Sequence, residues 1–370
     1  MIKNSLKVML LITGLILVAI VVGLFLIRDR KINTDVTAKT TKVGLILIGD
    51  RNDASYNQAH YDAIMNIKDE LNLEILCRDH VPEDKSCRDA IEDLIEEDCR
   101  VIIGGSFGYG PHIREMAQEH PEVCFLHATG TEKMTNVASY MGRMYQTRYL
   151  AGIVAGKRTE SGKIGYVAAF PYSEVIRGLN AFTLGVRSVA PDAEVHVRFC
   201  GSWEDDGAAE AATKKLLDAQ PRIDVLTLHT DSLVPLQIAD QRGISSIGYN
   251  MDNAAKFPDT FLTACVWHWD TYYRNKILSV LQGKFYGEND WIGMEYGIVG
   301  LSELTGNVAP GTQDELYKAR ERFASRRFDV FYGPVTDNEG RLRVPEGESM
   351  SDDEMLNRFD WYVEGVVVEE

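Results

Sequence analysis

Short apolar runs alternate with longer amphipathic stretches along most of the chain after residue 41. The runs KVGLILIG (42–49), RVIIGG (100–105) and KIGYVAAF (163–170) are each followed by a stretch in which apolar residues recur at helical spacing. Buried strands of this length, separated by helices of ten or more residues, are typical of βαβ units and a parallel sheet. The pattern therefore predicts an α/β fold.

The alternation runs through the chain twice. The break is GKRTESGK (156–163), whose glycine, serine, threonine and charged residues have the composition of a hinge or linker. We predict two doubly wound parallel-sheet lobes, residues 42–160 and 161–262, and a tail, 263–370, that returns to complete both lobes. Because open parallel sheets bind ligands at the carboxyl ends of their strands, two such lobes would enclose a cleft that closes around a ligand.

The segment before the lobes is strongly apolar. Residues 8–27 form an unbroken apolar run, about 30 Å long as a helix and sufficient to span a bilayer. No cysteine follows the run, so a lipoprotein cleavage box is absent, and a secretory signal usually has a shorter apolar region. We predict that residues 1–41 are an uncleaved single-span transmembrane helix and linker, with a cleaved signal peptide as the alternative.

Charge and cysteine usage narrow the class of function. The formal net charge is -16, and basic residues gather near the N-terminus, so the remaining chain is more acidic still. Such a surface repels a phosphate backbone, which argues against binding of nucleic acid. The six cysteines form no CxxC pair and no metal-ligand spacing with histidine. Cys77 and Cys87 bracket one loop and could form a disulfide outside the cell.

Aromatic and polar residues follow the ends of the predicted strands. Singly, each is more often part of a core, a rim or a helix cap than of a binding site. Together they combine flat apolar faces with a few hydrogen-bonding groups, which suits a planar ligand with polar edges, and stacking on one aromatic ring contributes about 1–3 kcal/mol per base. The candidate ligand-binding residues are Tyr56, Asn57, Tyr109, Thr129, Phe170, Trp203, Asp231, Asp252, Trp267 and Trp269.

Motifs for catalysis are missing from the sequence. It contains no GxSxG, GxxxxGK[ST] or HExxH pattern. His229 could act as a general base oriented by Asp231, but no nucleophile or set of metal ligands accompanies this pair. We therefore predict a protein that is not an enzyme and that needs no cofactor or metal.

Several motifs resemble one known family. The chain from about residue 42 to residue 370 resembles the basic membrane protein family, substrate-binding proteins of ABC importers with the type I periplasmic-binding fold. The resemblance implies that Tyr56 and Trp203 sandwich a purine, that Asp252 occupies a ribose-binding position, and that Trp267 replaces a ribose-contacting lysine. It rests on NDASYNQ (52–58), NVASYMGRMYQTRYLAGIVAGK (136–157), GSWEDD (201–206) and GYNMDN (248–253).

A branch of this family carries motifs like HTDS (229–232) and VWHWDTYY (266–273), and some of its members are similar to nucleobase binders. Since Trp267 would fill the space of the sugar, we expect a bare purine base such as adenine rather than a nucleoside; Trp269 could wall the pocket or pack between the lobes. The resemblance implies an extracytoplasmic, membrane-anchored monomer that delivers its ligand to an ABC importer permease. The alternatives are a tethered sensor without transport, a sugar-binding protein and a nucleosidase-like hydrolase.

Overall fold

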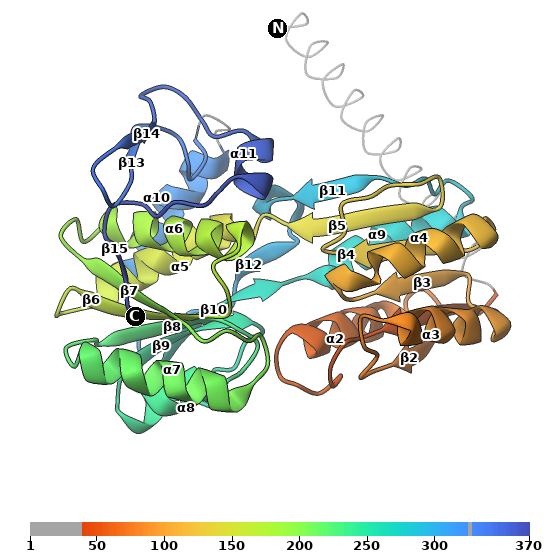
Figure 1. Ribbon diagram of the computed structural model, residues 1–370, viewed down its shortest axis with the longest axis horizontal. Coiled ribbons are helices and arrows are strands. Elements are labelled where there is room, and N and C mark those ends of the chain that lie inside the picture. The colour runs from red at the N-terminus through yellow and green to blue at the C-terminus, as the bar shows by residue number, and fades with distance from the viewer. Residues whose placement is uncertain (1–38, 325–327) are drawn as a thin grey trace, which may run out of the picture.

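The computed structural model describes residues 39–324 and 328–370 (Figure 1). The transmembrane helix expected at residues 8–27 lies outside these residues. Among the described helices, none combines the length and the apolar character that crossing a membrane requires. The described chain folds into two lobes that lie side by side along the long axis of Figure 1.

The N-terminal lobe is built on a six-stranded sheet in the order β11-β5-β4-β3-β1-β2, in which every pair is parallel. Helix α9 packs against α2, while α3 packs against α4 in a separate apolar cluster. The sheet thus has helices on both faces, which explains why its strands are continuously apolar. The elements are β1 (Thr41–Ile46), α2 (Tyr56–Lys68), β2 (Leu73–Arg78), α3 (Lys85–Glu96), β3 (Val101–Gly104), η1 (Phe107–Tyr109), α4 (Gly110–Glu119), β4 (Cys124–Ala128), β5 (Val137–Gly142), α9 (Trp269–Leu281) and β11 (Asn289–Ile292).

The C-terminal lobe has a seven-stranded sheet in the order β12-β10-β9-β8-β6-β7-β15, parallel except for the β10–β12 pair. Helices α5 and α6 lie above this sheet in Figure 1, and α7 and α8 lie below it. The elements are α5 (Met144–Arg158), β6 (Lys163–Ala168), α6 (Ser173–Arg187), β7 (Glu194–Phe199), α7 (Asp206–Ala219), β8 (Val225–His229), α8 (Val234–Gln241), β9 (Ser245–Asn250), β10 (Phe261–Trp267), η2 (Met294–Tyr296), β12 (Val299–Leu301) and β15 (Val366–Val368).

The described chain passes between the lobes three times, after β5, after β10 and after β11. The last part of the chain stays with the C-terminal lobe: α10 (Thr312–Ala324) packs on α5, and α11 (Asp352–Asn357) packs on α6. Between these helices β13 (Val335–Thr336) and β14 (Leu342–Val344) form a small antiparallel pair. The lobes are therefore joined by three segments of chain rather than by a single linker.

The motif YLAGIVAG (149–156) packs helix α5 against helix α6 at very short range. A Cβ atom added at Gly152 would lie 2.0 Å from the carbonyl oxygen of Phe182, and one at Gly185 would lie 2.0 Å from that of Tyr149. Real Cβ atoms do not approach so closely, so glycine is required at both positions. These two glycines let the backbones of the two helices touch.

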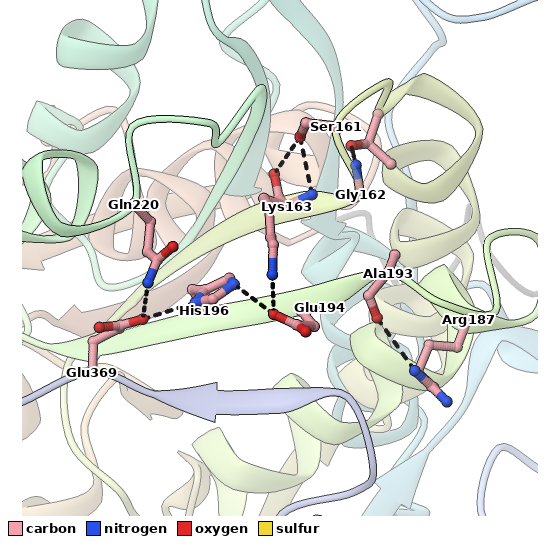
Figure 2. Close-up of polar contacts among 10 residues, drawn as sticks. Ser161, Gly162, Lys163, Arg187, Ala193, Glu194, His196, Gln220 and Glu369 are labelled. Carbon is pink, nitrogen blue, oxygen red and sulfur yellow. Dashed lines mark hydrogen bonds and ion pairs between the residues drawn. The ribbon is translucent and has the colours of Figure 1, made fainter.

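The final strand β15 pairs in parallel with β7 at the edge of the sheet. Figure 2 shows how side chains fasten this end of the chain: His196 of β7 lies between Glu194 and Glu369, 3.2 Å and 2.8 Å from their carboxylate oxygens. Gln220 donates a hydrogen bond of 3.0 Å to Glu369. The C-terminal residues are therefore held to the lobe by backbone and side-chain contacts.

The cysteines form no disulfide. Cys77 and Cys87, which the sequence allowed to pair, are both free thiols, so that alternative is wrong. Burial raises the pKa of Cys77 to about 11 and that of Cys87 to about 12, so both thiols stay protonated at neutral pH. They act as small apolar side chains.

Candidate ligand-binding cleft

A cavity of about 520 Å³ lies between loops of the two lobes. The N-terminal lobe contributes the loop from Ile48 to Ala54 between β1 and α2, together with Asn57 and His80. The C-terminal lobe contributes Glu204, Asp206, residues 231–234, Gln237 and Lys256. These loops follow the carboxyl ends of parallel strands, where open α/β sheets bind their ligands.

Tyr56 is the first residue of α2; it stands between Ala54 and Asn57, which line the cavity, but does not line it itself. The carboxylate of Asp53 positions it by accepting hydrogen bonds from the backbone amides of Ser55, Asn57 and Gln58. The ring of Tyr56 packs edge-on against His60 at 4.7 Å. Burial raises the pKa of the Tyr56 hydroxyl well above its usual value, and the nearby Tyr140, Asp231 and Glu174 raise it further. Ser55, the residue before Tyr56, accepts a hydrogen bond of 2.9 Å from Asn250 of the other lobe, so the start of α2 lies where the two lobes meet.

Trp203 approaches from the C-terminal lobe, in the loop between β7 and α7. Its carbonyl oxygen accepts hydrogen bonds from the backbone amide of Asp231, at 2.7 Å, and from the hydroxyl of Thr230. Its half-buried ring packs edge-on against Phe170, at 6.3 Å, and against His229, at 6.1 Å. Trp203 and Tyr56 thus come from different lobes, and Asn250 connects their neighbourhoods: it donates to Ser55, which precedes Tyr56, and to Asp231, whose amide donates to the carbonyl of Trp203.

Asn250 connects the two lobes. Its side-chain amide donates to Asp231 of its own lobe, at 2.7 Å, and to the hydroxyl of Ser55 in the other lobe, at 2.9 Å. Its side-chain oxygen accepts from the indole Nε1 of Trp267 at 2.8 Å. Asn250 ends β9 with a φ of 69°, a left-handed conformation that asparagine tolerates better than most residues. We did not predict Asn250 from the sequence, although it stands in the GYNMDN motif two residues before Asp252.

Asp231 is the carboxyl group most affected by its surroundings in the cleft. Burial, followed by the negative charge of Asp53, raises its pKa to about 8, although the hydrogen bond from Asn250 opposes this shift. The group is therefore largely a neutral acid at neutral pH. It can donate as well as accept a hydrogen bond.

The tryptophans of VWHWDTYY form a stack of rings behind Tyr56. Trp267 and Trp269 stack at 4.5 Å with planes 12° apart, and Trp269 in turn stacks on His60 at 5.3 Å. Their exposed fractions are only 6% and 1%. The stack spans the crossing from β10 to α9, so these aromatic side chains pack where the chain passes from one lobe to the other.

Four further candidate residues have their polar groups engaged with close neighbours. Tyr109 is fully buried and donates to the carbonyl oxygen of Val81 at 2.6 Å. The side chain of Asn57 bonds Asp53 and the amide of Gly49, and the hydroxyl of Thr129 bonds the preceding carbonyl. Asp252 is exposed and accepts from the amide of Ala254. None of these four groups is directed to Tyr56 or Trp203 by a hydrogen bond within the described chain.

The structure adds a buried polar cluster behind Trp203. His229 lies 3.3 Å from Glu174 through Nε2 and 3.0 Å from the hydroxyl of Tyr166 through Nδ1. Burial lowers the pKa of His229 to about 4, so its imidazole is neutral. The side chain that pairs with His229 is thus Glu174, whereas Asp231 pairs with Asn250. Within the described residues no cluster of His, Cys, Asp or Glu is arranged to hold a metal ion.

Two lobes built on parallel sheets, with a cleft between loops at the carboxyl ends of their strands, form the architecture of a solute-binding protein. Residues 40–330 match the Bmp family, described as "ABC transporter substrate-binding protein PnrA-like". The chain belongs to this family, which confirms the resemblance inferred from its motifs.

Comparisons with individual proteins agree on the fold. The chain is 34% identical over 327 residues to a purine-binding protein of Brucella abortus, covering 88% of this chain and 92% of that one. It is 32% identical over 329 residues to a putative ABC transporter glucose-binding protein of Haloferax volcanii, covering 89% and 81%. The crystal structure of a transcriptional activator of the comK gene from Bacillus halodurans superposes with a TM-score of 0.68 at 24% identity, covering 76% and 97%.

Proposed function

We propose that this substrate-binding protein captures a purine-type ligand, a nucleobase such as adenine in preference to a nucleoside, and delivers it to an ABC importer. The observation that carries the proposal is that hydrogen bonds of Asn250 bring together, from opposite lobes, Ser55 beside Tyr56 and Asp231, whose amide donates to Trp203. Rings contributed by both lobes can hold a flat heterocycle between them. The 34% identity to a purine-binding protein supports the same ligand class.

The preference for a base rests on Trp267. The family resemblance implies that Trp267 replaces a lysine that contacts ribose, and here its Nε1 donates a hydrogen bond to Asn250. An indole in that place removes a charged donor and fills the volume of a sugar. A ribose would therefore lose a partner and meet apolar surface.

Transport would use closure of the lobes. A ligand that contacts both lobes favours the closed form over the open one, and the permease of the importer recognises the closed form. In this proposal residues 1–41 anchor a monomer to the outside of the cell membrane, and the chain catalyses no reaction. Fractionating cells that express the full chain tests the anchor: release into the soluble fraction would contradict it.

Calorimetric titration with adenine and adenosine tests the ligand. We expect tighter binding of adenine, because the closed site lacks room and partners for ribose. Replacing Tyr56 or Trp203 by alanine should weaken binding by about tenfold or more, since each removes one stacking face. Tyr317→Ala, an exposed aromatic on α10, is the matched control and should bind as the wild type does. Tighter binding of adenosine would contradict the proposal.

A sugar is the second candidate ligand. The glucose-binding relative, together with Asp231, Glu174 and Asn250 beside Trp203, favours it, because sugars stack on tryptophan and bond to carboxylates and amides. Titration with glucose under the same conditions separates the two. If the protein binds glucose but not adenine, the proposed ligand class changes from a purine to a hexose.

A sensor without transport is a third possibility, favoured by the likeness to a transcriptional activator. Deleting the gene and measuring uptake of labelled adenine distinguishes the two roles. Transport predicts that uptake falls, whereas a sensor predicts unchanged uptake by the existing importers.

A further inference from the structure

We infer that Glu174 determines ligand specificity: its carboxylate accepts a hydrogen bond from an amino group on the edge of the bound heterocycle. The inference rests on the proposed function and concerns a residue that was not among the predicted ligand contacts. It names the chemical feature that the ligand must carry, an N–H donor at its rim.

Glu174 has an acceptor oxygen that no group of the described chain uses. It is the second residue of α6 and follows the carboxyl end of β6. Its Oε1 contacts His229 at 3.3 Å, while Oε2 makes no hydrogen bond within the described part of the chain. The side chain keeps 30% of its surface accessible, although it is not among the residues that line the cavity described above. One carboxylate oxygen is therefore available to a bound molecule.

No charged side chain among the described residues bonds Glu174 directly. Its neighbour His229 is a neutral imidazole, which can donate from Nε2 to Glu174 while accepting from Tyr166. The nearby guanidinium groups are used elsewhere: Arg148 donates to the carbonyl of Leu228, and Arg177 donates to that of Met355. Since 30% of the Glu174 side chain is accessible, a bound ligand can donate a hydrogen bond to the carboxylate in place of water.

The carboxylate lies beside the proposed stacking rings. His229, which contacts Glu174, packs against the ring of Trp203 at 6.1 Å, and the charge of Glu174 is close enough to raise the pKa of Tyr56. If a flat ring is bound between Tyr56 and Trp203, its edge would lie next to the carboxylate of Glu174. An ionised carboxylate only accepts hydrogen bonds, so that edge must donate.

The experiment compares adenine with purine, which has the same ring system but no amino group. Both are titrated calorimetrically into the purified full chain, its Glu174→Met variant and a control, Glu210→Met. The control removes a carboxylate that is exposed on α7 of the same lobe. Methionine matches glutamate in length but offers no strong acceptor.

The wild type and the control should bind adenine at least about tenfold more tightly than purine, the effect of one charged hydrogen bond. Glu174→Met should reduce this ratio to about threefold or less, mainly by weakening adenine. A purely structural role of Glu174 would weaken both ligands alike and leave the ratio unchanged, and that result would overturn the inference. If Glu174→Met does not fold, as judged by thermal unfolding, Glu174→Gln takes its place in the test. The ratio of its affinities for adenine and purine should lie between about threefold and about tenfold. A ratio equal to that of the wild type would overturn the inference.

The outcome also separates the inference from the proposed function. Binding of both ligands with equal affinity by the wild type would preserve the purine site and reject the role of Glu174. Failure of the wild type to bind either ligand would reject the purine site itself, and the role of Glu174 with it.

Discussion

Asp231 links the stability of the folded protein to pH. Its pKa of about 8 in the folded chain, raised by burial and by Asp53, lies far above the value of about 3.9 for an exposed aspartate. The folded state therefore holds this proton more tightly than the unfolded state does. The stabilisation is fully present below about pH 4 and is lost as the pH rises through about 8.

Asp231→Asn should remove this dependence, because asparagine keeps an acceptor for Asn250 but cannot ionise. Between pH 4 and 8 the free energy of unfolding of the variant should rise relative to that of the wild type, by up to about 1.4 kcal/mol per pH unit. Denaturant unfolding at pH 5, 6.5 and 8 measures the difference, with the exposed Asp192→Asn as control. Parallel pH curves for Asp231→Asn and the wild type would contradict the assignment.

At the same scale, the sequence identified the ends of strands but not the directions of side chains. Phe107 and Tyr109 both follow β3, yet Phe107 is 66% exposed and Tyr109 is fully buried. Likewise, the left-handed turn at Asn250 directs that side chain toward Ser55 and leaves Asp252 exposed. These directions depend on backbone angles and on contacts between lobes, which a local pattern does not contain. The predicted ligand contacts remain predictions until a ligand is bound.

The pairing of α5 with α6 shows how an element can depend on the absence of a side chain. Both helices are mostly buried, and they touch at Gly152 and Gly185, where an added methyl group would meet backbone atoms. Backbone cannot rearrange as a flexible side chain can. The helices must separate to make room, and this loosens the core beneath them.

Gly152→Ala should therefore destabilise the protein by about 1–3 kcal/mol or more, despite the higher helix propensity of alanine. The matched control is Gly306→Ala, because a Cβ atom at Gly306 meets nothing within 4 Å. Comparing the free energies of unfolding of the two variants in denaturant is the measurement. Equal stability of both variants would show that the helices tolerate a methyl group at this contact.

At the scale of the elements, the regular part of the fold could be predicted from the sequence. The α/β fold with parallel sheets is confirmed, because long buried strands and amphipathic helices leave a strong signal. The short strands of the tail were harder to recognise. Strands β11, β12 and β15 have three or four residues and are partly exposed, so only their pairing with other strands defines them.

At the scale of the whole molecule, hydrogen bonds at the cleft hold the lobes together. Asn250 donates to Ser55, and Asn253 donates to the carbonyl of Ala54 at 3.3 Å. These contacts join the end of β9 and the loop after it to the loop before α2. They form only when the lobes approach each other, so they stabilise the closed form selectively.

Asn250→Ala should accelerate ligand release. Loss of the bond to Ser55, together with those to Asp231 and Trp267, should raise the dissociation rate about fivefold or more, since a hydrogen bond contributes about 0.5–1.5 kcal/mol. Stopped-flow tryptophan fluorescence, with a ligand identified by titration, gives the rate. Asn357→Ala, at the exposed end of α11, serves as control. An unchanged rate for Asn250→Ala would mean that this residue does not hold the lobes closed.

The position of β15 has a practical consequence for handling the protein. This three-residue strand covers the border of the sheet along β7, and His196 and Gln220 secure the glutamate that follows it. An uncovered strand is a template for recruiting strands from other molecules. A protein truncated before Gly365 would lack β15, and β7 would become an exposed edge strand that can pair with another molecule. A dimer of such a truncated protein would therefore be a result of the truncation and not evidence of a native dimer.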